Sequence, residues 1–288
     1  MDEFAAPCLV IGAKGMLGRD LCSAMRLAKI RLVEMDIDEI DISSMPSVLG
    51  AFRKAKPRMV INLAAVTDVD GCEFKQDLAF SVNALGAENL AIASREFGSF
   101  LIHMSTDYVF DGSSDKPYRE NDLPNPLGVY GKTKFEGEIR IQEALPMNHL
   151  IVRTQWLYGE HGKNFVDTII KAGRQNKKLR IVNDQHGAPT YTVDLAEAII
   201  ELGGLRLSGI VHCTNSENTT WSGFASRILG MVGLTDVEIE EINTEELGRP
   251  APRPLNSVLD TSKFERLTGM KLRCWENALQ EYLSKRNF

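Results

Sequence analysis

A tyrosine and a lysine stand four positions apart near the middle of the chain, at Tyr130 and Lys134. On a helix, residues i and i+4 lie on the same face, so these two side chains can meet. An ammonium beside a phenol favours the phenolate and lowers the pKa of the tyrosine from its ordinary value of about 10. The pair therefore predicts a proton donor or acceptor that works at neutral pH.

Hydroxyl side chains precede this pair at the end of an apolar run. The run Phe100–Met104 has the composition of a buried strand, and Ser105 and Thr106 follow it directly. A Tyr-x-x-x-Lys spacing alone often arises by chance on charged helices. A Ser-Thr pair at a strand end upstream of that spacing is a much more specific combination. We therefore expect catalysis at Ser105–Thr106 together with Tyr130 and Lys134.

Three glycines near the N-terminus, Gly12, Gly15 and Gly18, separate an apolar run from a helical pattern. Glycines between a strand and a helix let a pyrophosphate approach the helix N-terminus. The spacing is GxxGxxG rather than the standard GxGxxG, so the glycines alone could serve only the turn. The buried strand expected at Cys8–Ile11 and an acidic residue farther along favour a dinucleotide site.

That acidic residue is Asp36, at the end of a second expected strand, Arg31–Met35. A carboxylate there can accept a hydrogen bond from a ribose hydroxyl and repels a 2′-phosphate, so NADH is favoured over NADPH. Asp36 could instead be a turn residue, and Asp38 and Asp41 are close enough to compete for the role. The small residues that end the next apolar run, 59–65, either let the cofactor approach the backbone or simply pack.

Short apolar runs alternate with helical patterns through the first half of the chain, and this alternation builds a parallel sheet covered by helices on both faces. Beyond about Thr154, loops and a proline cluster interrupt the pattern. The predicted fold class is α/β, a Rossmann-type doubly wound parallel sheet with a smaller C-terminal substrate-binding lobe. We assign the dinucleotide-binding domain to 1–155 with a return segment near 190–220, and the lobe to 156–190 and 221–288. Further strands are expected at 150–153 and 210–213, and helices near 45–55, 77–97, 222–232 and 274–285.

Bulk composition is that of an ordinary globular protein, with 43% hydrophobic and 25% charged residues. The net charge of −6 argues against a nucleic-acid partner, which needs a clustered basic face, and the basic stretch 171–180 is interpreted as a solvated helix end. No apolar stretch reaches the roughly 18 residues of a membrane span, so no membrane partner is expected. The five cysteines are scattered without ligand spacing, which favours a reducing, cytoplasmic location.

These motifs resemble the extended short-chain dehydrogenase/reductase superfamily and, within it, the dTDP-4-dehydrorhamnose reductase family. The glycine loop and the Tyr130–Lys134 spacing mark only the superfamily. Three segments are far more specific to the reductases: Ser105–Gly112 (STDYVFDG), Arg153–Gly159 (RTQWLYG) and Arg253–Ser257 (RPLNS). The resemblance covers nearly the whole chain.

The resemblance implies NAD(P)H-dependent reduction of the 4-keto group of dTDP-4-dehydro-β-L-rhamnose to dTDP-β-L-rhamnose. In that reaction Tyr130 would protonate the developing alkoxide, and Lys134 would hold the nicotinamide ribose and depress the Tyr130 pKa. Thr106 would donate a hydrogen bond to the carbonyl oxygen, where negative charge develops. By the same resemblance the cofactor would be lined by Gly12, Gly15, Met16, Leu17, Asp36, Asp41, Ile42, Ala64, Ala65, Thr67, Met104, Tyr130 and Lys134.

The resemblance also implies residues for the nucleotide-sugar substrate. Asp107 and Trp156 would contact the sugar or nucleotide, and the planar fork of Arg253 matches a diphosphate. Trp156 could instead be a core residue, and Arg253 a surface residue. Some family members bind Mg²⁺ through carboxylates at a homodimer interface, and a homodimer is compatible with this chain. Asp20 is the one candidate ligand, and no metal site is assigned because first-turn acids usually face the helix dipole.

Two other functions remain open at this point. Methionine adenosyltransferase has a non-catalytic regulatory subunit of the same fold, and such a subunit can keep the Tyr-x-x-x-Lys pair. An extended-family epimerase or dehydratase would keep NAD⁺ tightly bound. Dehydratases usually carry an acidic pair beside the catalytic hydroxyl, whereas here Thr106 is followed by one aspartate and then Tyr108, which weakens that alternative.

Overall fold

The computed structural model describes residues 7–286 of the chain. Its central element is a six-stranded sheet in the order β10-β5-β4-β3-β1-β2, and every strand pair in it is parallel. The strand order changes direction at β1, because β2 lies on one side of β1 and β3 on the other. The strands are β1 (Cys8–Ile11), β2 (Leu32–Met35), β3 (Met59–Asn62), β4 (Phe100–Thr106), β5 (His149–Thr154) and β10 (Gly209–His212).

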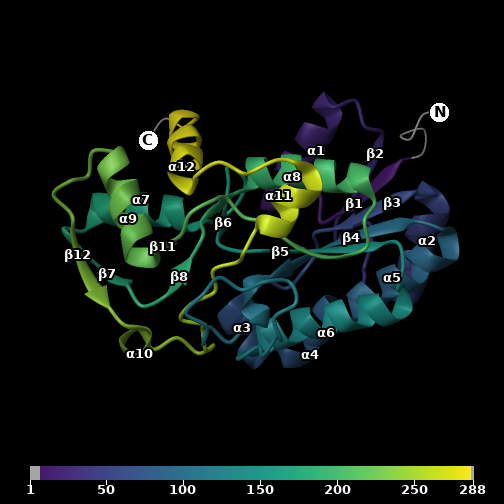
Figure 1. The fold of residues 1–288 in the computed structure, drawn as a ribbon, viewed down its shortest axis with the longest axis horizontal. Helices are drawn as coiled ribbons and strands as arrows, with labels where there is room; N and C mark the ends of the chain where they lie inside the picture. Colours follow the sequence, from purple (N-terminus) through teal and green to yellow (C-terminus); the bar gives the residue numbers. More distant parts are fainter. Residues whose placement is uncertain (1–6, 287–288) are drawn as a thin grey trace.

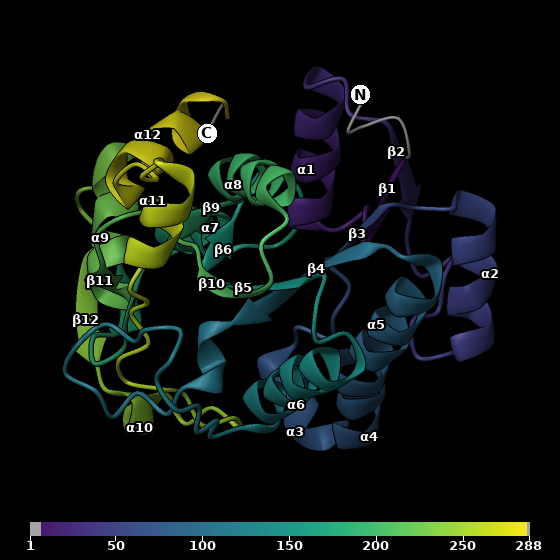
Figure 2. The same cartoon turned by 45° about the vertical axis from the view of Figure 1, so that its right-hand side comes forward.

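Helices cover both faces of this sheet (Figure 1), and in Figure 2 α1 and α8 lie on one side while α2, α5 and α6 lie on the other. The predicted doubly wound Rossmann-type fold is therefore confirmed. Short helical segments α3, α4 and η1 connect β3 to α5. The bounds are α1 (Met16–Leu27), α2 (Met45–Ala55), α3 (Val69–Phe74), α4 (Gln76–Phe80), η1 (Ser81–Leu85), α5 (Gly86–Phe97), η2 (Asp107–Val109), α6 (Val129–Ala144) and α8 (Thr192–Leu205).

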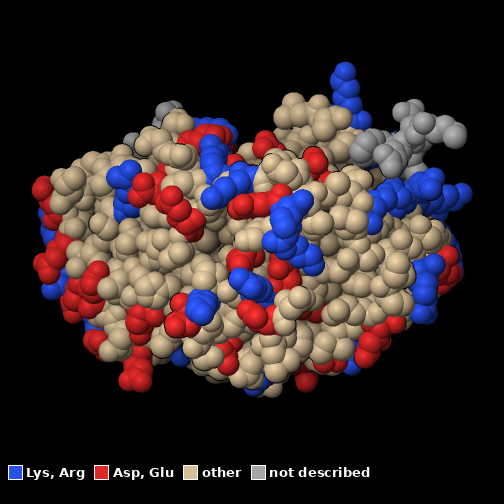
Figure 3. Space-filling view, viewed as in Figure 1, with Lys and Arg blue, Asp and Glu red and all other residues tan. Residues whose placement is uncertain are grey.

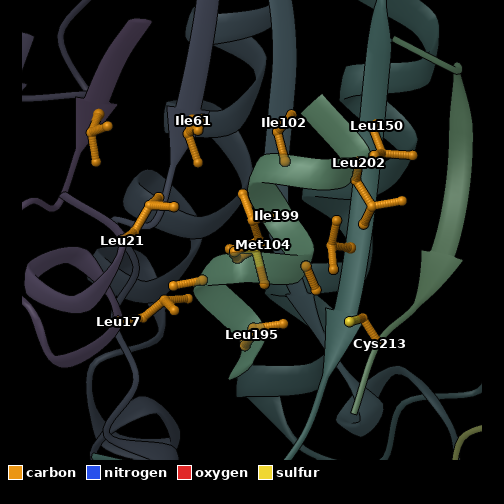
Figure 4. Packing of buried hydrophobic residues seen from close by; sticks show 14 of the residues in the cluster. Leu17, Leu21, Ile61, Ile102, Met104, Leu150, Leu195, Ile199, Leu202 and Cys213 are labelled. Atoms are coloured by element: carbon orange, nitrogen blue, oxygen red, sulfur yellow. The ribbon is translucent and has the colours of Figure 1, made fainter. Parts of the chain in front are cut away.

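Residues that alternate along each strand feed two separate cores, because successive side chains point to opposite faces of a sheet. Val10 belongs to the core under α1 and α8, whereas its neighbours Leu9 and Ile11 belong to the core under α2, α5 and α6. Figure 4 shows the first core, where Leu17 and Leu21 of α1 meet the α8 side chains Leu195, Ile199 and Leu202 over the strands. Burial on both faces explains why the strands are apolar throughout.

A third core lies apart from the sheet and is rich in aromatic side chains, among them Tyr158, Tyr191, Phe224, Trp275 and Tyr282. Although Phe264 of α11 belongs to the core under α1 and α8, this third core is built by segments among those that follow β5 in the sequence. Their bounds are β6 (Leu157–Tyr158), α7 (Phe165–Gln175), β7 (Lys178–Val182), β8 (His186–Gly187), β9 (Thr190–Tyr191), β11 (Thr219–Thr220), α9 (Trp221–Met231), β12 (Glu238–Ile242), α10 (Thr244–Leu247), α11 (Ser262–Thr268) and α12 (Trp275–Ser284).

Two features differ from the sequence prediction. The single helix expected over 77–97 is divided into α4, the π-helical turn η1 and α5, although its composition shows no break. Helix α8 was not predicted. It is mostly apolar and eight of its 14 residues are buried, so its exposed face carries only two charged residues, Glu197 and Glu201.

Charges are mixed over the surface rather than gathered by sign, as Figure 3 shows for one face. The basic stretch 171–180 ends in β7, where Lys178 Nζ lies 2.9 Å from Glu238 Oε1 and 3.2 Å from Glu240 Oε2 of the neighbouring strand β12. Those glutamates offset the charge at the β7 end of the stretch. Among residues 7–286, no helix is both long and apolar enough to cross a membrane.

Candidate active site

The predicted catalytic residues converge where β4 ends beside the first turns of α6. Thr106 is the last residue of β4, and Tyr130 and Lys134 lie one turn apart at the start of α6. The Lys134 Nζ donates to the backbone carbonyl of Met104 at 2.6 Å, which ties the helix to the strand. The hydroxyl of Thr106 lies near the Tyr130 phenol and favours its ionised form. The structure thus brings a phenol, a hydroxyl and an amine to the carboxyl edge of the sheet.

The protonation of Tyr130 differs from the sequence expectation. Loss of hydration raises the pKa of its phenol above the ordinary value, the contact with Thr106 only partly opposes that effect, and nearby Asp107 raises the pKa further. The prediction that Lys134 lowers this pKa is wrong for the structure, because the Lys134 Nζ is directed to Met104 O and His103 Nε2. Tyr130 is therefore a neutral phenol at pH 7, in the form of a proton donor.

Lys134 is itself perturbed, because it is almost completely buried at 2% exposure. Burial lowers the pKa of its ammonium group to about 8, and the negative charge of Glu138 opposes that shift only in part. Glu138 is a weak counter-charge, since Arg153 binds both of its oxygens at 2.9 and 2.6 Å. Ser105 also donates to Glu138, so the hydroxyl next to Thr106 points away from the site.

Thr106 has a second partner in the residue that follows it. Its hydroxyl donates to Asp107 Oδ1 at 2.9 Å and accepts the Tyr108 amide at 3.2 Å. Burial raises the pKa of the Asp107 carboxyl to about 6, although the hydroxyls of Ser257 and Thr106 partly stabilise its charge. Asp107 is thus a buried carboxylate directly behind the hydroxyl, rather than an exposed group.

The glycine loop has the shape that a dinucleotide needs. Gly12 has a φ of +81°, and a Cβ there would meet the Ala64 backbone nitrogen at 2.9 Å, so only glycine fits this turn. Gly15 is the N-cap of α1, and no side chain caps that end of the helix. The first amides of α1 are therefore free of a side-chain cap, which suits a pyrophosphate at a helix N-terminus.

Asp36, Asp38 and Asp41 were the three candidates for the ribose position, and Asp36 is the one that binds the backbone of the glycine loop. Its Oδ2 accepts the Lys14 backbone amide at 2.7 Å, and its Oδ1 accepts the Ile37 amide at 2.9 Å. Asp38 binds the Lys14 ammonium at 2.6 Å, and Asp41 accepts the amide and hydroxyl of Ser43. Asp36 therefore holds the glycine loop in place, and its ribose contact stays a prediction.

The remaining predicted cofactor residues form two groups. Ala64 and Ala65 are partly exposed and Thr67 is exposed, all in the loop after β3, and Met16 is partly exposed at the start of α1. The side chains of Leu17, Ile42 and Met104 are buried in the sheet cores instead. The Ile42 side chain fills the space beside Gly86, so it packs in the core.

Arg253 lies in an ion pair. Its Nη1 and Nη2 each lie 3.1 Å from one oxygen of Asp70 at the start of α3, and Nη1 also donates to Ala251 O at 2.8 Å. The Arg253 interaction lowers the pKa of Asp70 although burial opposes it. Arg253 is therefore a fixed guanidinium that joins the C-terminal segment to the loop after β3.

Trp156 follows β5 and is partly buried. Its ring stacks on Trp221 with 3.7 Å between the centroids and 13° between the planes, and Trp221 also packs against Phe165. The backbone of Trp156 has a φ of +49°, a strained conformation for a bulky residue. The structure shows packing on one side of the Trp156 ring, and the predicted contact with a ligand stays a prediction.

Several residues in this region were not assigned a role from the sequence. His103 contacts both Asn62 and Lys134. Asp70 binds Arg253, and Glu73 accepts the Val129 amide at 2.8 Å at the start of α6. One signal was available for His103, because a histidine inside a fully buried apolar strand must have hydrogen-bond partners. The partners themselves are distant in the sequence.

No group of three or more His, Cys, Asp and Glu side chains within residues 7–286 is arranged to hold a metal ion. Asp20, the one candidate considered for Mg²⁺, accepts a hydrogen bond from the Thr192 hydroxyl and lies 3.7 Å from His161 Nε2. These contacts give it a structural role between α1 and α8.

Comparisons with known proteins agree along the whole length of the chain. The RmlD substrate binding domain family matches residues 7–288. The chain is 41% identical over 279 residues to the spore coat polysaccharide biosynthesis protein SpsK of Bacillus subtilis, covering 97% of each. It is 40% identical over 278 residues to a dTDP-4-dehydrorhamnose reductase of Streptomyces griseus, covering 95% of this chain and 91% of that one.

Solved structures give the same result. A dTDP-4-dehydrorhamnose reductase of Clostridium acetobutylicum superposes with a TM-score of 0.93 at 40% identity, covering 97% of this chain and 99% of that one. A dTDP-4-dehydrorhamnose reductase of Bacillus anthracis in complex with NADP superposes with a TM-score of 0.93 at 34% identity, covering 98% and 99%. The chain therefore belongs to the RmlD substrate binding domain family.

Proposed function

We propose that this chain is an oxidoreductase that reduces the 4-keto group of dTDP-4-dehydro-β-L-rhamnose to dTDP-β-L-rhamnose with a nicotinamide cofactor. One observation carries the proposal in a chain of this family: Thr106, Tyr130 and Lys134 meet at the carboxyl edge of the sheet that also holds the glycine loop. In doubly wound sheets ligands bind at that edge.

The described residues fit a nicotinamide dinucleotide. Gly12 and Gly15 leave the loop and the α1 N-terminus open to a pyrophosphate, and Asp36 stands at the end of β2 for a ribose hydroxyl. Ala64, Ala65 and Thr67 provide a low-profile surface after β3, where backbone can approach the cofactor closely. When bound, the cofactor supplies a hydride to the sugar carbonyl carbon.

The chain's own groups manage the proton. Tyr130, a neutral phenol, gives its proton to the carbonyl oxygen as that oxygen becomes an alkoxide. Thr106 turns its hydroxyl proton from Asp107 to the same oxygen and stabilises the developing charge. Lys134 holds the nicotinamide ribose with an N–H that Met104 does not use.

We assign the substrate to the segments 156–190 and 221–288, which we treat as a lobe over the sheet edge. Trp156 and Asp107 contact the sugar nucleotide, and Arg253 binds the diphosphate in place of Asp70, because its fork matches phosphate oxygens as well as a carboxylate. NADH is preferred over NADPH, because the negative charge of Asp36 repels a 2′-phosphate.

The test is an assay with enzymatically generated dTDP-4-dehydro-β-L-rhamnose and either NADH or NADPH, followed by identification of the product by NMR. The expected result is one cofactor oxidised per dTDP-β-L-rhamnose formed. A parallel reaction with the 5-epimeric 4-keto sugar defines which sugar is preferred. No turnover on any 4-keto sugar, together with tight binding to a methionine adenosyltransferase, would replace the reductase proposal by a regulatory role.

A further inference from the structure

Three buried polar side chains form a line from the end of β3 to α6. Asn62, His103 and Lys134 are exposed by only 1%, 1% and 2% of their surfaces. The Asn62 Nδ2 lies 3.0 Å from His103 Nδ1, and the His103 Nε2 lies 3.1 Å from Lys134 Nζ. Because buried polar groups must satisfy one another, the donors and acceptors along this line can be assigned.

The assignment begins at the backbone. The Ala64 N–H donates to Asn62 Oδ1 at 3.1 Å, and a backbone amide can only donate. The oxygen of the Asn62 amide therefore faces Ala64, and its NH₂ group faces His103. An amide turned the other way would place the NH₂ of Asn62 against the Ala64 N–H, donor against donor. The Asn62 NH₂ consequently donates to His103 Nδ1.

Since His103 Nδ1 accepts, the neutral imidazole must carry its hydrogen on Nε2. That hydrogen points at Lys134 Nζ, which also donates to Met104 O at 2.6 Å. An ammonium has three donors and no lone pair, so it cannot receive the Nε2–H. We infer that His103 is a positioning residue that stabilises the neutral amine form of Lys134 in the cofactor-free protein, with Asn62 setting the tautomer.

Burial favours the uncharged forms of both side chains. It lowers the pKa of Lys134 to about 8 and the pKa of His103 well below its usual range. The other charged group that acts on Lys134 is Glu138, on the same helix, and it is already bound by Arg153 and Ser105. Neither His103 nor Lys134 thus has a free counter-ion among its neighbours in the described part of the chain.

Protonation of Lys134 has a structural consequence. If Lys134 becomes an ammonium, it must donate to His103 Nε2, so Nε2 has to be the unprotonated ring nitrogen. The imidazole hydrogen then lies on Nδ1, where it faces the NH₂ group of Asn62, donor against donor. Each proton gained by Lys134 therefore costs one hydrogen bond at Asn62. The backbone amide of Ala64, in the loop predicted to line the cofactor, is coupled through two side chains to the charge of the catalytic lysine.

The direct test is ¹⁵N NMR of the histidine rings in the cofactor-free full chain, which distinguishes a protonated from an unprotonated ring nitrogen. His149 and His212 are internal references, because each places Nδ1 against a backbone carbonyl, at 2.6 and 3.0 Å, and must carry its hydrogen there. At a pH above the Lys134 pKa of about 8, His103 is expected to show the opposite tautomer, with hydrogen on Nε2. Hydrogen on Nδ1 of His103 would overturn the inference.

A substitution at Asn62 should reverse the donor and acceptor roles of the hydrogen bonds from Asn62 through His103 to Lys134. In Asn62→Asp, one carboxylate oxygen accepts the Ala64 amide and the other accepts from His103 Nδ1, so Nε2 becomes an acceptor and Lys134 becomes an ammonium. The expected outcome is an inverted His103 tautomer and a raised Lys134 pKa, read from the pH titration of its labelled side chain. Asn89→Asp adds the same charge in the same domain outside the line and should leave both unchanged.

The role of Asn62, His103 and Lys134 in catalysis rests on the proposed reductase function, whereas the His103 tautomer does not depend on it. Loss of turnover on every 4-keto sugar, with the His103 tautomer as stated, would remove the function and keep the inference. An unchanged tautomer and an unchanged Lys134 pKa in a folded Asn62→Asp protein would remove the inference and keep the function.

Discussion

The hydroxyl of Thr106 donates to the carboxylate of its neighbour Asp107 at 2.9 Å, beneath the surface of the molecule. Both residues were expected to serve the substrate, yet the structure pairs them with each other. The pair places the Asp107 carboxyl, whose pKa is raised to about 6, directly behind the Thr106 hydroxyl. That hydroxyl is proposed to donate a hydrogen bond to the developing alkoxide. The protonation state of Asp107 therefore affects both stability and the donor strength of Thr106.

The raised pKa of Asp107 makes stability depend on pH. A carboxyl that is harder to ionise when folded favours the native state at low pH, and that contribution is lost as the pH rises from about 4 to about 6. A shift from 3.8 to about 6 corresponds to about 3 kcal/mol. The difference in unfolding free energy between Asp107→Asn and the parent should therefore grow by about 3 kcal/mol between pH 4 and pH 7. Urea unfolding measures it, and a constant difference would contradict the raised pKa.

Tyr130→Phe removes the proton donor and leaves the ring in place. Turnover should fall roughly 100- to 10,000-fold, the range for loss of a general acid, while the Kd for NADH stays near that of the parent. Tyr108→Phe is the matched control, because its ring packs edge-on against Tyr130 with 5.6 Å between the centroids. Stopped-flow turnover and cofactor titration give both quantities. Near-normal turnover in Tyr130→Phe would exclude it as the donor.

Asp36→Asn tests the preference for NADH. The variant keeps an oxygen for the Lys14 amide and removes the charge that opposes a 2′-phosphate. The ratio of kcat/KM for NADPH to that for NADH should rise by roughly tenfold. Asp38→Asn removes an equal charge that binds the Lys14 ammonium instead, so a similar rise in this control would show that net charge, rather than Asp36, sets the preference.

Arg253→Lys tests the diphosphate contact. Lysine cannot reproduce the two-point fork, so the Kd for the nucleotide sugar should rise about tenfold, or about 1.4 kcal/mol, with cofactor affinity unchanged. Asp70→Asn weakens the competing ion pair and should leave the sugar-nucleotide affinity equal or tighter. Calorimetric titration with dTDP and with the full sugar nucleotide separates the contributions. Equal losses in both variants would mean that the pair is structural.

The buried ion pair of Glu138 and Arg153 should dominate local stability. Both side chains are exposed by 1% or less, so Glu138→Gln leaves a buried guanidinium without its charge partner and should cost about 3–5 kcal/mol. The double variant Glu138→Leu/Arg153→Met removes both charges and should recover most of that loss. Chemical unfolding of the three proteins checks it, and additive losses would show that the two residues act independently.

The sequence alone determined the fold class and the main chemical groups of this protein. Apolar runs alternating with helical patterns are a local property, so β1, α2 and β4 could be predicted almost to their ends. The glycine loop and the Tyr130–Lys134 spacing are equally local. The bounds of α2, predicted near 45–55 and found at Met45–Ala55, show how far such patterns reach.

Only the tertiary structure decided how these groups pair. Lys134 meets His103 rather than Tyr130, Thr106 gives its proton to Asp107, and Arg253 binds Asp70, 183 positions away. No local pattern encodes such contacts, because desolvation and hydrogen-bond partners are set by which segments the sheet brings together. The pKa values of Tyr130 and Lys134 follow from that burial, and so does the direction in which the site moves its proton.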